Sequence, residues 1–108
     1  MLKLKNLEKL KTTHIGKWKI VGIEECYKNE HHIGGDHYNI RLSRDGHIGA
    51  AIQIEREAGE YGYNVCVCYN QYDRFISTTA WPKDRLLNKD NFFASMQGIL
   101  DAEYDKHN

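Results

Sequence analysis

Histidines gather in one stretch of the sequence, where a bound metal ion is the first chemistry to consider. His31, His32, His37 and His47 fall within 17 residues, and zinc takes its four ligands from His, Cys and carboxylate side chains. The spacing does not match a recurrent ligand pattern, because the chain has no paired Cys-x-x-Cys or His-x-x-x-His here. We therefore interpret these histidines as part of a solvated polar loop and of hairpin ends, and we predict no metal and no cofactor.

Two cysteines offer a second kind of chemistry, that of a thiol nucleophile. Cys66 and Cys68 lie two residues apart in an alternating run, so in a strand they share one face. A nucleophilic thiol needs a base beside it, which here would be His37 or His47. The middle of a regular strand is a poor place for a nucleophilic thiol, since catalytic groups concentrate at loops and strand ends. We predict no catalytic residue and keep a small metal- or thiol-dependent enzyme as a third hypothesis.

The cysteine count also bears on the compartment. With Cys26 the chain has three cysteines, and its first residues hold too many lysines for the apolar stretch of a signal peptide. An odd number of cysteines without a secretion signal indicates reduced thiols, so we expect a cytoplasmic protein. No apolar run approaches the length of about 18 residues that crosses a membrane, and no membrane partner is expected.

Charge is balanced over the whole chain but uneven along it. The 108 residues hold 15 basic and 15 acidic side chains, which argues against a general nucleic-acid coat. Six lysines nonetheless fall within residues 1–20, against one glutamate. Basic side chains contact phosphates, and an aromatic ring among them stacks on bases. Nucleic-acid binding is therefore an alternative function. Its candidate contact residues are Lys3, Lys5, Lys9, Lys11 and Trp18.

Aromatic side chains are a further group with functional potential. The chain has seven tyrosines and two tryptophans, and most of them fit ordinary sheet packing. A ring in a turn or at the end of a strand is less easily explained by burial. Tyr, Trp and Arg dominate binding hot spots, because they bury much area and keep a polar group. The candidate partner-binding residues, expected around the turn at 70–73 and the strand after it, are Tyr69, Tyr72, Arg74 and Trp81.

Alternation and turn signals predict the strands that would position these residues. The runs HYNIRLS and HIGAAIQIERE flank Asp45 and Gly46, and Asp-Gly between alternating runs is a strong hairpin signal, because a tight turn needs positive φ. Gly22 indicates a bulge. Short links between the strands require antiparallel pairing. The five candidate strands lie within residues 17–27, 37–43, 47–57, 61–70 and 74–81.

Two helices are expected, one before the strands in the sequence and one after them. Residues 6–12 form a short helix, and Asp90 or Asn91 caps a longer one. In the longer helix Phe92, Met96, Ile99 and Leu100 recur at helical spacing, so this face must lie on an apolar surface.

The predicted fold is α+β: an antiparallel meander of four to five strands with a C-terminal amphipathic helix on one face and a short N-terminal helix. It forms one compact domain over residues 1–108. A basic helical segment spans 1–16, the sheet spans 17–81 and the C-terminal helix spans 90–105.

No motif in the chain matches a catalogued catalytic signature, and the GGDH stretch is neither a P-loop nor a dinucleotide fingerprint. In its lack of such motifs and its use of Lys, Asn, Ile and Tyr, the chain resembles small accessory proteins of bacteria and their phages. That resemblance implies binding and blocking of another protein, as immunity proteins and anti-defence inhibitors do. The leading hypothesis is a non-enzymatic protein-binding module, a steric inhibitor of a bacterial nuclease, toxin or defence enzyme. A nucleic-acid-binding accessory protein is the alternative.

Overall fold

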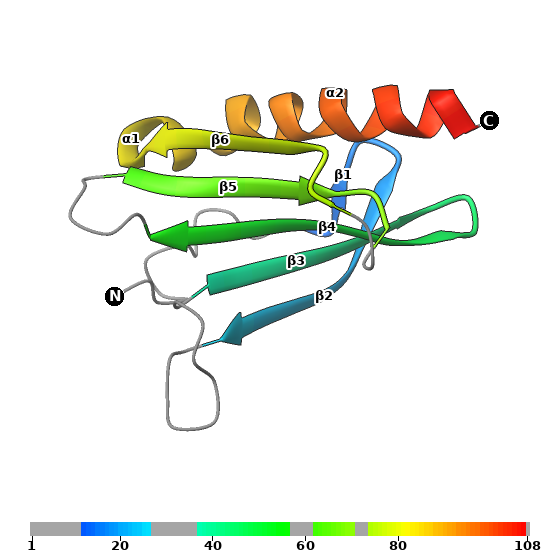
Figure 1. The fold of residues 1–108 in the computed structure, drawn as a ribbon, viewed down its shortest axis with the longest axis horizontal. Helices are drawn as coiled ribbons and strands as arrows, with labels where there is room; N and C mark the ends of the chain where they lie inside the picture. The colour runs from blue at the N-terminus through cyan, green and yellow to red at the C-terminus, as the bar shows by residue number, and fades with distance from the viewer. Residues whose placement is uncertain (1–11, 27–36, 57–61, 71–73, 108) are drawn as a thin grey trace.

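The protein was analysed as a computed structural model, which describes residues 12–26, 37–56, 62–70 and 74–107. Figure 1 shows an antiparallel sheet with a long helix against it, which confirms the α+β class and the C-terminal helix. The sheet has one strand more than expected. The helix expected over residues 6–12 falls almost wholly outside the described residues. The elements are β1 (His14–Ile15), β2 (Trp18–Cys26), β3 (His37–Arg44), β4 (His47–Arg56), β5 (Gly62–Cys68), β6 (Ser77–Pro82), α1 (Lys83–Leu86) and α2 (Lys89–His107).

The sheet is a meander in which each strand pairs antiparallel with the next, in the order β1 to β6. The predicted hairpin between β3 and β4 is confirmed: Asp45 and Gly46 form its two-residue turn, with φ of 47° and 85°. A two-residue hairpin needs this pair of positive angles. The sequence does not predict β1, because two residues are too few to show an alternation. Gly16, with φ of 60°, turns the chain so that Ile15 pairs with Trp18.

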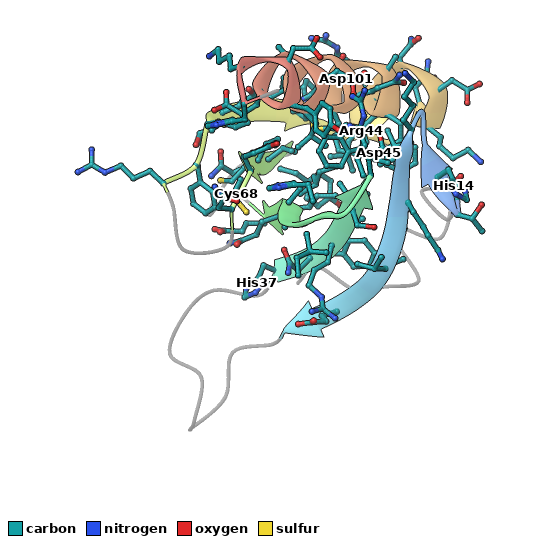
Figure 2. All side chains as sticks on the ribbon, turned by 90° about the vertical axis from the view of Figure 1, so that its right-hand side faces the viewer. His14, His37, Arg44, Asp45, Cys68 and Asp101 are labelled. Atoms are coloured by element: carbon teal, nitrogen blue, oxygen red, sulfur yellow. The ribbon has the colours of Figure 1, made fainter. Side chains whose placement is uncertain are left out.

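Two irregularities bend the sheet. The register of β2 against β3 shifts between Ile20 and Gly22, where the sequence indicates a bulge. A second shift leaves Gly49, with φ of 104°, without a partner residue in β3. Bulges increase the local twist of a sheet. The sheet consequently curls around its apolar face, as Figures 1 and 2 show. The helix α2 contacts both β1 and β5.

The hydrophobic core fills the space between the curled sheet and α2. The side chains predicted to face the helix are all buried to at least 99%, and they pack with Phe92, Met96 and Leu100. This confirms the predicted face of each central strand. Burial of one such aliphatic side chain contributes about 1.5–3 kcal/mol. The sheet residues of this group are Tyr38, Ile40, Leu42, Ala50, Ile52, Ile54, Val65 and Val67.

The start of the long helix differs from the prediction. The carbonyl oxygen of Asn88 accepts a hydrogen bond from the Phe92 N–H at 2.9 Å, so Asn88, and not Asp90 or Asn91, precedes the first turn. The short helix α1 replaces part of the connection expected over residues 83–89, because Leu86 is fully buried and holds this segment against the core. Within the described residues, neither helix is long and apolar enough to cross a membrane.

Candidate functional site

Asp101 on α2 joins the helix to two distant parts of the sheet. Its Oδ1 accepts a hydrogen bond from Arg44 Nη1 at 2.7 Å and another from Trp18 Nε1 at 2.8 Å. Arg44 ends β3, and its guanidinium carbon lies 3.9 Å from the ring centre of Tyr104. Figure 2 shows Arg44 and Asp101 at the same end of the molecule. The Arg44 side chain is only 10% exposed, so a carboxylate and an aromatic ring compensate the charge of a nearly buried guanidinium.

Three rings stack beside this ion pair. The ring centre of Tyr69 lies 4.0 Å from that of His47 and 4.9 Å from that of His107. His47 Nε2 donates a hydrogen bond to the carbonyl oxygen of Tyr69 at 2.8 Å. The Trp18 ring packs edge-on against the rings of His47 and Tyr69. Burial is the largest of the causes that raise the pKa of the Tyr69 hydroxyl. We name these residues the Asp101 cluster: Trp18, Arg44, His47, Tyr69, Asp101, Tyr104 and His107.

The polar groups of the Asp101 cluster are mostly directed at one another. The cluster brings together the start of β2, the hairpin between β3 and β4, the end of β5 and the last turns of α2. Its contacts hold the helix over the open end of the curled sheet. We therefore assign the Asp101 cluster a structural role.

The four residues predicted to bind a partner do not form one exposed patch, which corrects their predicted clustering. Tyr69 and Trp81 are buried, with 5% and 8% of their surface exposed. Trp81 pairs with Tyr63, six residues before Tyr69, so the two rings lie about 20 Å apart along the strand direction. Both face the core because strand alternation puts them on the side of α2. Arg74 is exposed, and Tyr72 lies outside the described residues.

The alternative nucleic-acid site falls only partly within the described residues. Trp18 is fully buried and donates its indole N–H to Asp101, so the ring has no free face for a base. The stacking role predicted for Trp18 is therefore corrected: it is a core residue. The remaining candidates, Lys3, Lys5, Lys9 and Lys11, lie outside the part of the chain that the structure describes.

The two strand thiols form no disulfide and are buried, at 3% exposure for Cys66 and 9% for Cys68. They lie on the sheet face opposite α2. The Cys66 Sγ accepts weak hydrogen bonds from the Asn64 amide at 3.5 Å and from the Thr78 hydroxyl at 3.8 Å. Burial raises the pKa of the Cys66 thiol more than these bonds lower it. A nucleophilic cysteine needs the thiolate, so this environment favours a packing role.

Of the four histidines that are grouped in the sequence, the two that the structure describes lie apart. His47 lies in the Asp101 cluster on the helix side of the sheet, whereas His37 pairs with Glu55 at the far end of β3. His31 and His32, like the side chain of Cys26, are outside the described residues. No group of three side chains suited to hold a metal ion occurs among the residues that the structure describes.

The strand β6 forms one edge of the described sheet; Pro82 ends it, but the strand lacks the charged side chains that usually protect an edge. Its only strand neighbour among the described residues is β5, and none of its six residues is charged. The side chains of Thr78, Thr79 and Ala80 are exposed. Phe75 and Ile76, which precede the strand, are 48% and 36% exposed. Natural edge strands normally carry charges, bulges or a covering element that prevents pairing with another chain.

The opposite edge of the sheet shows this protection. The strand β2 carries Lys19 and Glu24, has a bulge before Gly22 and is paired with β1 at its beginning. Val21 and Ile23 are 50% and 39% exposed there, but they stand between charged side chains on an irregular strand. The two edges therefore differ in charge and in regularity, and β6 is the uncharged one.

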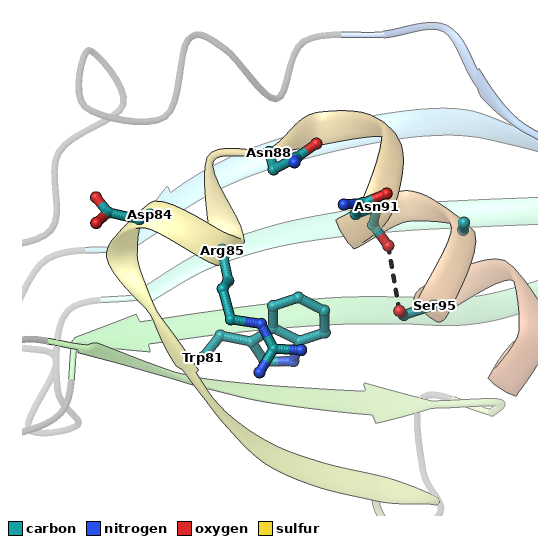
Figure 3. Close-up of a pocket in the computed structure, with 7 residues that line it drawn as sticks. Trp81, Asp84, Arg85, Asn88, Asn91 and Ser95 are labelled. Carbon is teal, nitrogen blue, oxygen red and sulfur yellow. Dashed lines mark hydrogen bonds between the residues drawn. The ribbon is translucent and has the colours of Figure 1, made fainter.

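A pocket of about 480 Å³ lies where β6, α1 and the first turn of α2 meet (Figure 3). Trp81 and Arg85 line it from β6 and α1, and the guanidinium carbon of Arg85 lies 5.2 Å from the Trp81 ring centre. Asn91 and Ser95 line it from α2, where the Ser95 hydroxyl donates to the Asn91 carbonyl oxygen at 3.1 Å. The Trp81 indole N–H is buried and has no hydrogen-bond acceptor among the described residues.

Sequence reasoning did not select Asp101 or Arg85. Asp101 gives only a weak signal, because it follows Leu100 directly and so lies at the border of the apolar face and not on it. Arg85 gives none, since it stands in a segment expected to be a plain connection. Comparison of the chain with protein-family models, with curated proteins and with solved structures finds no match.

Proposed function

We propose that the protein is a non-enzymatic binding module that recognises another protein by adding one of its extended segments to the β6 edge. The observation that supports this most is the six-residue edge without a single charged side chain. An edge strand offers a row of backbone N–H and C=O groups, and a chain that pairs with it gains main-chain hydrogen bonds. Such recognition needs no catalytic group and no cofactor.

Exposed side chains next to β6 supply the apolar contacts of the proposed interface. Phe75 and Ile76 lead into the strand with large exposed fractions. Arg74 is exposed beside them and contributes a polar group to the rim. Binding energy typically concentrates in a few such aromatic and Arg anchors. Trp81 has a different role from that predicted: it is a buried support that packs edge-on against Phe92, with ring centres 5.1 Å apart.

The rigidity of the edge also supports a binding role. The Asp101 cluster and the core hold the sheet in place, so binding of an added segment costs little conformational entropy in the protein itself. A module of this kind acts sterically, by covering the surface of its partner. Its proposed partner is an enzyme of a bacterium or phage, in the manner of an immunity or anti-defence protein.

A charge placed on the β6 edge tests the proposal. Thr79→Lys puts an ammonium on the exposed edge, and Val21→Lys puts the same charge on the opposite edge as a matched control. The immobilised wild type and the control variant should capture the same protein from a bacterial lysate, identified by mass spectrometry. With that partner purified, Thr79→Lys should bind at least about tenfold more weakly.

Two readouts decide the outcome. Amide hydrogen exchange at β6 should slow when the partner binds, because its outer N–H groups become hydrogen-bonded. Unchanged exchange at β6, or full affinity of Thr79→Lys, would contradict strand addition. The nucleic-acid alternative predicts instead that affinity for a nucleic acid exists and falls steeply with salt concentration.

A further inference from the structure

The pocket at the end of β6 holds hydrogen-bond donors that the described part of the chain leaves unsatisfied. The Trp81 side chain is 8% exposed, and its indole N–H has no acceptor there. A buried donor without a partner costs free energy, so such a group calls for an acceptor. Arg85 is exposed and forms no ion pair with a described residue, and its guanidinium lies over the Trp81 ring, as Figure 3 shows.

The long helix α2 adds to the positive potential of this pocket. Its 19 residues begin at Lys89, and the free N–H groups of a first helical turn carry a partial positive charge, which Asp90 in the same turn partly offsets. Asn88 and Asn91 line the pocket with amide groups. Asp84 also lines it, but Figure 3 shows its carboxylate pointing away from the Arg85 guanidinium. A group that accepts hydrogen bonds and carries negative charge is therefore the chemistry that this pocket favours.

The space around the pocket suits a side chain that arrives on an extended segment. Ala94 and Ser95 present small exposed side chains at its wall. A Cβ atom added to Gly98, one turn further along α2, would meet nothing within 4 Å. A volume of about 480 Å³ exceeds that of a carboxylate alone and leaves room for the methylene groups of a longer side chain.

We infer that the pocket receives the carboxylate of a glutamate or aspartate side chain on the partner segment that pairs with β6. Arg85 binds the carboxylate through the paired N–H groups of its guanidinium, which match two carboxylate oxygens. In this arrangement the carboxylate is also the acceptor that the Trp81 N–H lacks among the described residues. This inference rests on the proposed function and names the chemistry of its partner.

Synthetic peptides test this inference directly. Hexapeptides of alternating Thr and Val, acetylated and amidated at their ends, carry one Glu at each position in turn, and a matched series carries Gln. Binding is measured by NMR titration to the wild type, to Arg85→Gln and to Arg41→Gln. Arg41 lies on β3, away from the β6 edge and the pocket, and its side chain is 52% exposed, so the last variant removes the same charge elsewhere and serves as the control. The best Glu peptide should bind the wild type and Arg41→Gln about tenfold more tightly than its Gln counterpart.

The same titrations separate the possible failures. Arg85→Gln should reduce the preference for Glu to less than about twofold while β6 amides stay protected by either peptide. Equal binding of Glu and Gln peptides to the wild type, with β6 protected, would overturn the carboxylate site and leave strand addition standing. Absence of binding, or binding that leaves β6 unprotected, would overturn both. Tighter binding of a Gln peptide with a free C-terminal carboxylate would overturn the side-chain assignment. A peptide-free dimer that Thr79→Lys dissociates would show that a second copy occupies the edge instead.

Discussion

Replacement of Asp101 by alanine should destabilise the protein much more than the same change at its neighbour in space, Asp45. The variant removes the acceptor of two hydrogen bonds, from Arg44 at 2.7 Å and from Trp18 at 2.8 Å. A hydrogen bond to a charged group contributes about 1.5–3 kcal/mol, and a stranded buried donor costs about 1–3 kcal/mol. Water compensates part of this loss, because the Asp101 side chain is 32% exposed. We expect a decrease of about 2–4 kcal/mol in the free energy of unfolding.

Asp45 provides the matched control. Its carboxylate lies 3.7 Å from Arg44 Nε, on a side chain that is 70% exposed. Solvent screens such a pair, so Asp45→Ala should change the free energy of unfolding by about 0.5 kcal/mol or less. Asp101→Asn keeps an acceptor oxygen and loses the charge, and should fall between the two alanine variants.

Urea unfolding followed by tryptophan fluorescence measures these differences, with all variants compared at the same slope. A double-mutant cycle between Asp101→Ala and Arg44→Met isolates the interaction of the pair and should give at least about 1 kcal/mol. The reasoning is refuted if Asp101→Ala is no more destabilising than Asp45→Ala, or if the cycle gives no coupling.

Three further outcomes are expected. Ile52→Ala, at a fully buried position, should cost about 2–5 kcal/mol in urea unfolding, whereas Ile48→Ala, where the side chain is 75% exposed, should cost less than about 0.5 kcal/mol. Gly46→Ala should destabilise by about 1 kcal/mol, because φ is 85° there, whereas Gly98→Ala, in open space on α2, should stabilise by about 0.5–1 kcal/mol; equal signs in thermal melting would contradict this contrast. Because burial raises the pKa of the Cys66 thiol, the unfolded chain loses this proton at a lower pH than the folded chain. Stability should therefore be complete below the ordinary thiol pKa of about 8.5 and decrease as pH rises from there towards the folded value, and Cys66→Ala should remove this part of the decrease in a pH series.

The features predicted correctly are those that neighbouring residues specify. Asp45 and Gly46 define a tight turn by themselves, and the alternation on both sides fixes which side chains enter the core. The strand β1 escaped prediction for the opposite reason, since it exists only through Gly16 and its pairing with β2. A Cβ atom at Gly16 would overlap the Gln97 side chain, so a contact with α2 also shapes this turn.

The candidate site was harder to predict because side-chain type says little about exposure. Tyr69 was selected as a ring near a turn, but it lies between two histidine rings that come from β4 and from the end of α2. The partners of Asp101 are 57 and 83 residues away in the chain, and no local pattern encodes such a pairing. Arg74 is the predicted partner-binding residue that the described structure leaves exposed.

The 83-residue span between Trp18 and Asp101 bears on how the chain is made. The strands leave the ribosome in the order in which they pair, so the meander can assemble step by step from neighbouring hairpins. The helix that covers its apolar face is synthesised after all of them. Until then the sheet exposes its core side chains together with the uncharged edge of β6, and Arg44 has no carboxylate from α2. We therefore expect packing of α2, rather than strand pairing, to be the step that completes the native state.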